Sequence, residues 1–180
     1  MKKEEFKEVH WFERLEADIA DADASTPNIT SEKWKQLRGE LGFERDLIPT
    51  YRWVYEMGLS LGISSQYRLV YRVLLSALYA LRDRLPPEEV FQFAAQLPQH
   101  LRGLFFAQYT ISGKPEKLSA AHLLKRIEEA GSDQLQKDAT EIFAAVLQLL
   151  SKHVSSGEMD HIYATMPEDI KALWNEAQNS

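Results

Sequence analysis

The sequence predicts an all-α protein: two tandem four-helix units packed as one helical domain, preceded by a helical N-terminal arm. Two observations lead to this class. Apolar residues recur every three or four positions along nearly the whole chain, and no alternating run indicates a strand. The second half of the chain also repeats the apolar pattern of the half before it. With 44% hydrophobic and 27% charged residues, the composition is that of an ordinary globular protein.

Residues 1–48 are predicted to form the arm. An amphipathic first helix is indicated by apolar residues three or four positions apart: Phe6, Val9, Phe12, Leu15 and Ile19. A polar connector follows, and Ser31 is placed to cap a second helix that Gly42 ends. Pro49 is expected to separate the arm from the rest of the chain.

Residues 49–110 and 111–180 are predicted to be two copies of one helical unit. A shift of 69 positions lays residues 53–105 on residues 122–174 without a gap. Identical residues at matched positions include Gly62 and Gly131, Leu78 and Leu147, Leu81 and Leu150, Glu89 and Glu158, Ala95 and Ala164, Pro98 and Pro167, and Leu104 and Leu173. Because the hydrophobic phase is also preserved, we interpret the match as a tandem duplication.

Each copy is expected to contain four helices. The first helix ends at the shared glycine, and the longest spans 65–84 in one copy and 133–152 in the other. Other helix starts are indicated by proline or by a capping serine: Pro87, Pro98, Ser119, Ser155 and Pro167.

Composition and charge exclude several function classes. The net charge of −6 disfavours nucleic-acid binding, which needs a basic face. No apolar run is long enough to span a membrane, and the first residues lack the apolar stretch of a secretory signal. The chain has no cysteine, which removes disulfides, thiolate catalysis and zinc-thiolate sites. We therefore expect a cytoplasmic protein with no nucleic-acid or membrane partner.

A search for catalytic or metal-binding residues gives no candidate. Glu158 and His161 have the Glu-x-x-His spacing of di-iron bundles, but the first copy offers Gln92 in place of the second histidine. Glu89 and Glu158 have a local explanation, since a carboxylate is favoured in the first turn of a helix and Ser155 with Glu158 has capping-box spacing. No serine lies in a nucleophile elbow. We predict no catalytic residue, no metal ligand and no cofactor.

A comparison of the two long helices indicates one candidate binding surface. In the first copy a broad apolar face is expected to form the core: Val70, Val73, Leu74, Ala77, Leu78, Ala80, Leu81 and Leu85. The arginine–tyrosine stripe, on the opposite side, spans about 80° of arc and consists of Arg68, Arg72, Leu75, Tyr79 and Arg82. The second copy has an ordinary polar face there: Lys137, Glu141, Ala144, Gln148 and Ser151. Arginine with an aromatic residue is enriched at protein contacts.

Three interpretations of the stripe remain open. It is a solvated face, or the acidic arm packs over it, or it is a surface for a partner, a second copy or an anionic ligand. All six basic residues of 51–110 are arginines, against four acidic residues there. The function that we predict is a non-catalytic protein-interaction or self-associating module, with a protein partner or a homodimer. The alternative is a small anionic ligand-binding protein or an enzyme with a pocket between the two units.

Several segments in combination resemble a known family: Leu81-Arg82-Asp83-Arg84-Leu85-Pro86-Pro87-Glu88-Glu89, Ala95-Gln96-Leu97-Pro98, Leu101-Arg102-Gly103-Leu104 and Ser112-Gly113-Lys114-Pro115. They resemble an uncharacterised bacterial family, domain of unknown function twenty-two sixty-seven, over about residues 50–176. The resemblance implies a cytoplasmic helical protein of unassigned function, and it supplies no catalytic residues. The segment 105–109 departs from the family pattern, which has two tyrosines followed by an acidic residue, glycine and tryptophan.

Overall fold

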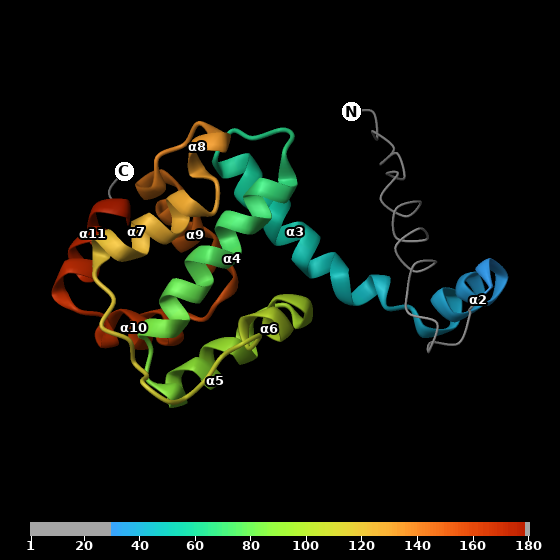
Figure 1. The fold of residues 1–180 in the computed structure, drawn as a ribbon, viewed down its shortest axis with the longest axis horizontal. Coiled ribbons are helices and arrows are strands. Elements are labelled where there is room, and N and C mark those ends of the chain that lie inside the picture. The colour runs from blue at the N-terminus through green and yellow to red at the C-terminus, as the bar shows by residue number, and fades with distance from the viewer. Residues whose placement is uncertain (1–29, 179–180) are drawn as a thin grey trace. The chain divides into compact units, whose positions relative to one another are not determined.

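The computed structural model describes residues 30–178 of the chain. These residues form ten α-helices and no strand, which confirms the predicted all-α class (Figure 1). The predicted first helix, at residues 6–19, lies outside the described residues. The chain divides into two compact units, Met1–Gly42 and Phe43–Ser180. No helix in the described part is long and apolar enough to cross a membrane.

Helix α2, Ser31–Leu41, is the described helix of the first unit. It is capped by Thr30, whose hydroxyl accepts a hydrogen bond from the backbone N–H of Lys33 at 3.3 Å. The predicted cap, Ser31, is instead the first helical residue. Gly42 ends the helix in the left-handed conformation, with φ of 62°, as predicted.

Helix α3, Glu44–Ser60, begins the second unit and runs through Pro49. The predicted break at this proline is therefore wrong. One face of the helix is buried from the residue after Pro49 onward and includes Thr50, Trp53 and Met57. The packing of this face offsets the single backbone hydrogen bond that the proline cannot make.

The remaining helices of this unit are α4 (Tyr67–Arg84), α5 (Pro87–Gln96), α6 (Gln99–Phe105), α7 (Ala120–Glu129), α8 (Ser132–Leu135), α9 (Ala139–His153), α10 (Ser156–Thr165) and α11 (Glu168–Gln178). The predicted starts of α5, α7 and α10 are confirmed. The predicted single helix over 133–152 is wrong, because Gln136 adopts the left-handed conformation between α8 and α9. Asp138 then caps α9 in a complete capping box with Glu141.

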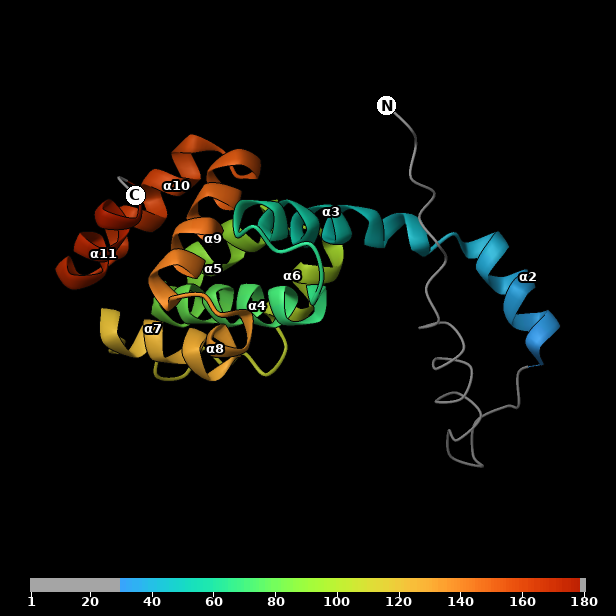
Figure 2. The ribbon, with the colours of Figure 1, turned by 90° about the horizontal axis from the view of Figure 1, so that it is seen from above.

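The two halves of this unit have equivalent neighbours. Helix α4 contacts α3, α6, α7, α8 and α9, and α9 contacts α3, α4, α7, α10 and α11. The contacts α3–α4, α3–α6 and α4–α7 have counterparts in α7–α9, α7–α11 and α9–α3. Figure 1 shows α4 running through the middle of the bundle, and Figure 2 shows α3 lying alongside it. These three pairs of contacts agree with a tandem duplication, which stays a prediction.

One hydrophobic core serves both predicted copies. Its buried side chains run from Trp53 in α3 to Ala177 in α11. All eight apolar residues predicted on the inner face of α4 are fully buried, which confirms the phase of that helix. The central helices α4 and α9 contribute the largest shares, and they contact each other.

Candidate functional site

The arginine–tyrosine stripe of α4 is divided by its exposure. Arg68 and Arg72 are exposed, whereas Leu75 and Tyr79 are half-buried. Leu75 packs against the core. Arg82 is different again, because only 9% of its side chain is exposed. The structure therefore brings the five residues onto one helix but opens only the first two fully to solvent, and their binding role stays a prediction.

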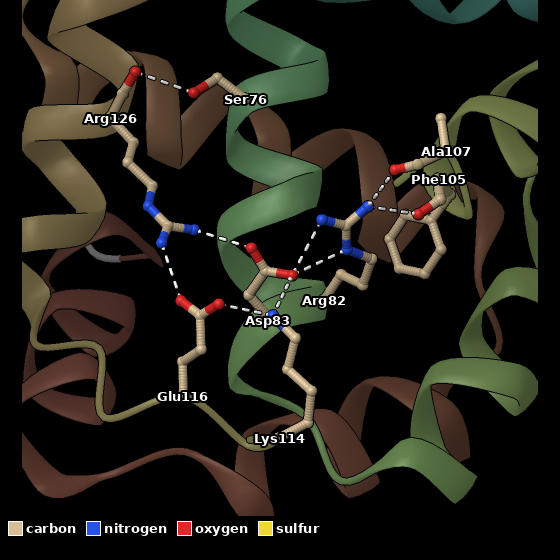
Figure 3. A network of polar contacts seen from close by, with 8 residues as sticks. All are labelled: Ser76, Arg82, Asp83, Phe105, Ala107, Lys114, Glu116 and Arg126. Carbon is tan, nitrogen blue, oxygen red and sulfur yellow. Dashed lines mark hydrogen bonds and ion pairs between the residues drawn. The ribbon is translucent and has the colours of Figure 1, made fainter. Parts of the chain in front are cut away.

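Arg82 points into a polar network at the C-terminal end of α4 (Figure 3). Its Nη1 donates to the carbonyl oxygen of Phe105 at 2.6 Å and to that of Ala107 at 3.4 Å. Its Nε donates to Oδ1 of Asp83 at 2.9 Å. The guanidinium also lies over the ring of Tyr79, 4.7 Å from the centroid, and over that of Tyr109, at 5.3 Å. The contact of Arg82 with Tyr79 and Tyr109 is therefore internal to the protein. A helical wheel gives the direction of a residue on its helix but not the path of a long side chain.

Asp83 is the centre of this network. Besides Arg82, its carboxylate pairs with Lys114 Nζ at 2.8 Å and with Arg126 Nη1 at 3.0 Å. Glu116 closes the ring by pairing with the same two cations, at 2.6 and 2.9 Å. Figure 3 shows the side chains converging from α4, the segment after α6, and α7. The network therefore joins three parts of the chain that are distant in sequence.

The electrostatics of the network favour its charged state. Burial by itself would raise the pKa of Asp83, but the hydrogen bond from Lys114 and the charge of Arg82 outweigh it, and the pKa lies below its usual value. Burial likewise opposes the charge of Lys114, yet the bonds to Asp83 and Glu116 raise its pKa. Every charge in the network has a partner, so removal of one member would leave another charge unpaired in a largely buried position.

A second polar feature lies between α5 and α10, the helices that carry Glu89 and Glu158. Ser155 caps α10, as predicted, by accepting from the N–H of Glu158 at 3.4 Å. The other half of the predicted capping box is wrong: the N–H of Ser155 donates to Oε1 of Gln96 at 2.8 Å, and one oxygen of Glu158 is buried without a partner. Burial, and then the charge of Glu89, raise the pKa of Glu158.

These carboxylates do not gather a recognisable ligand set. Within residues 30–178, no group of three or more histidine and carboxylate side chains is arranged to hold a metal ion. The charge of His161 has a smaller, opposite effect on the pKa of Glu158, which remains raised.

The exposed apolar surface lies on α3, where the sequence analysis did not place it. Four large apolar residues of this helix are between 47% and 57% exposed: Ile48, Tyr51, Tyr55 and Leu59. At 100° per residue they share about 80° of arc, opposite the buried face of Trp53 and Met57. We call these four residues the outer face of α3. Their spacing of three and four was visible in the sequence, but it does not say which of two apolar faces the core covers.

Charged and aromatic side chains border the outer face of α3. Arg45 and Arg52 are exposed on one flank. Farther along the same flank, Glu56 accepts from Lys152 Nζ at 2.8 Å and contacts His153 Nε2 at 2.7 Å. The hydrogen bond from Lys152, and then that with His153, lower the pKa of Glu56.

A hollow adjoins the start of α3. It has a volume of about 390 Å³ and is mostly apolar, with Leu47 from α3 and Leu104 from α6 in its lining. Phe43, 64% exposed, stands at its edge. Gly103 contributes no side chain, and nothing would lie within 4 Å of a Cβ added there. A second, smaller and more polar hollow of about 280 Å³ lies between α10 and α11. Neither of the two combines residues from both predicted copies.

Comparison with known proteins supplies a family and no activity. No curated protein matches the chain. The model of a family described as "Uncharacterized conserved protein (DUF2267)" matches residues 51–173, from the third turn of α3 to the middle of α11. The match confirms the resemblance seen in the sequence. The chain belongs to the DUF2267 family.

Proposed function

We propose that this protein is a non-catalytic interaction module and that its contact surface is the outer face of α3. One observation supports the proposal above the others. Of the eight large apolar residues that are exposed in the described part of the chain, six fall between Leu41 and Leu59, and four of these form a single stripe. Contiguous apolar surface of this kind marks contact sites on proteins.

The chemistry of the stripe agrees with such a role. Tyrosine supplies large, rigid contact area with a polar end, and it is enriched with arginine at the centres of protein interfaces. The outer face combines Tyr51 and Tyr55 with the flanking Arg52. The core does not need these side chains, because α3 already buries Trp53, Val54 and Met57 on its other side.

Site-specific photo-crosslinking in living cells tests the proposal. A photoreactive residue in place of Tyr55 should crosslink to one defined protein, and the same residue in place of Asp133, an exposed position at α8, should not. The captured protein is then purified, and its affinity for the wild-type chain and for a Leu59→Glu variant is measured. We expect at least a tenfold loss of affinity. Equal affinity, or identical crosslinks at both positions, would refute the proposal.

A further inference from the structure

We infer that the partner of the outer face of α3 is an amphipathic helix that carries acidic residues along one flank. The inference rests on the proposed function and names the class of partner. Two features of the second compact unit lead to it: the length and spacing of the stripe, and the charges beside it.

The shape of the stripe fits a helix. From Ile48 to Leu59 the apolar residues extend over about 17 Å along α3, and they recur at intervals of three, four and four residues. A partner helix that lies along α3 presents its own apolar residues at the same intervals, so that each side chain fits between two of the stripe. An extended strand alternates every two residues and would match only some of these positions.

The hollow between α3 and α6 does not belong to this surface. At 100° per residue its lining residues Phe43, Asp46 and Leu47 continue the buried side of α3, away from the outer face. A partner helix that lies along the outer face is therefore held by the stripe and by the charges beside it.

The charges select an acidic partner. Arg45 and Arg52 are exposed on the same flank of α3, and neither has an acidic partner among the described ion pairs of that helix. In an antiparallel pair of two α3 helices, the arginine flank of one copy would face the arginine flank of the other. Like charges in this position disfavour self-pairing, whereas glutamates on a different helix would be attracted.

Two synthetic helical peptides of about five turns test the inference against full-length protein by fluorescence anisotropy. Both carry leucines at the spacing of the stripe; one has glutamates along one flank and the other has lysines at the same positions. We expect the glutamate peptide to bind at least tenfold more tightly. Arg45→Glu with Arg52→Glu should reverse this preference. Lys117→Glu with Lys125→Glu, which changes two exposed basic residues outside both surfaces, is the matched control and should leave it unchanged.

The outcomes separate the inference from the proposed function. If the lysine peptide binds as tightly as the glutamate peptide, or if neither binds, the partner class is wrong, while crosslinking from position 55 still decides the proposed function. Sedimentation equilibrium tests whether a second copy of the chain occupies the outer face of α3. A wild-type dimer that Leu59→Glu converts to a monomer would show that the partner is a second copy and not an acidic helix. Circular dichroism checks that each variant keeps its helical content.

Discussion

At the scale of single residues, Asp83 has the largest predicted effect on stability. Its carboxylate accepts from Arg82, Lys114 and Arg126, and only 10% of its side chain is exposed. In Asp83→Asn the buried guanidinium of Arg82 loses its counter-charge. We expect the free energy of unfolding at pH 7 to fall by about 3 kcal/mol, as measured by urea denaturation. Asp160→Asn, an exposed carboxylate, is the control and should change it by less than about 0.5 kcal/mol.

The pH dependence of the same variant gives a second test. Because the folded pKa of Asp83 is lower than its unfolded value, the charged carboxylate stabilises the fold above the unfolded pKa, and this contribution is lost as the pH falls through the folded value. The stability difference between wild type and Asp83→Asn should therefore be complete at neutral pH and shrink below about pH 3.9. A difference that stays constant down to pH 2 would contradict the assignment of the charge.

Glu158 is predicted to show the opposite sign. Burial and the charge of Glu89 raise its folded pKa, so the ionised form destabilises the protein at pH values above the folded pKa. Glu158→Gln removes the charge and retains the shape. We expect the free energy of unfolding of the variant to be about 1 kcal/mol higher than that of wild type at pH 8. The difference should vanish as the pH falls to the pKa of an unfolded glutamate, about 4.3. Thermal denaturation over this pH range measures it.

Glu88 supplies the control for Glu158. It also lies in the first turn of a helix, but it is exposed. Glu88→Gln loses the favourable interaction with the helix dipole without relieving a buried charge, so stability should fall slightly, by about 0.5 kcal/mol. If both variants were more stable than wild type, negative charge in general, and not the burial of Glu158, would determine the result.

At the scale of secondary-structure elements, a single side chain holds the end of α5. Arg102, in α6, donates to the carbonyl oxygens of Ala94, Ala95 and Leu97 at 2.9, 2.8 and 3.1 Å. Carbonyls at the end of a helix are generally short of backbone partners, although that of Ala94 also accepts from the N–H of Leu97 at 3.1 Å. Arg102→Ala should lower the free energy of unfolding by about 1 kcal/mol, and Arg102→Lys should recover little of it, because an ammonium cannot span three carbonyls.

The equivalent position in the second copy calibrates this prediction. Lys171 occupies it and pairs with Glu168, an exposed residue of its own helix, at 3.1 Å. Lys171→Ala should therefore cost less than Arg102→Ala in the same urea titration. Equal losses would indicate that the position matters for packing and that the carbonyl contacts of Arg102 do not.

The elements also show which features local sequence can predict. Proline at the start of α5 and serine before α7 and α10 act within one turn, and these starts were predicted correctly. The break at Gln136 was not, because a left-handed residue other than glycine leaves no clear mark in the sequence. Arg82 was placed on an outer stripe by its phase on the helix, but a side chain of this length turns back to the carbonyls of Phe105 and Ala107.

At the scale of the whole molecule, the sequence predicted the helical class and the core face of α4 but not which face of α3 is exposed. Periodicity identifies apolar faces, and α4 has one such face, so its burial followed directly. Helix α3 has two. Only the packing of α4, α6 and α9 around it decides that Trp53 is buried and Tyr55 is exposed. The choice between two apolar faces is a tertiary property, and it could not be made from a single helix.

The shared core leads to a last prediction, about the two predicted copies. Helix α7, in residues 111–180, packs on α4, and α9 packs on α3, so each predicted copy, 49–110 or 111–180, completes the core of the other. A fragment of residues 111–180 would expose the apolar faces of α7 and α9 that α3 and α4 cover. We expect it to lack a cooperative thermal transition by circular dichroism. A fragment of residues 43–110 should behave alike, and an equimolar mixture should regain helical content and a single transition. If the fragment 111–180 unfolds cooperatively by itself, the prediction is wrong. Each half of the unit then has a core that is stable without the other half.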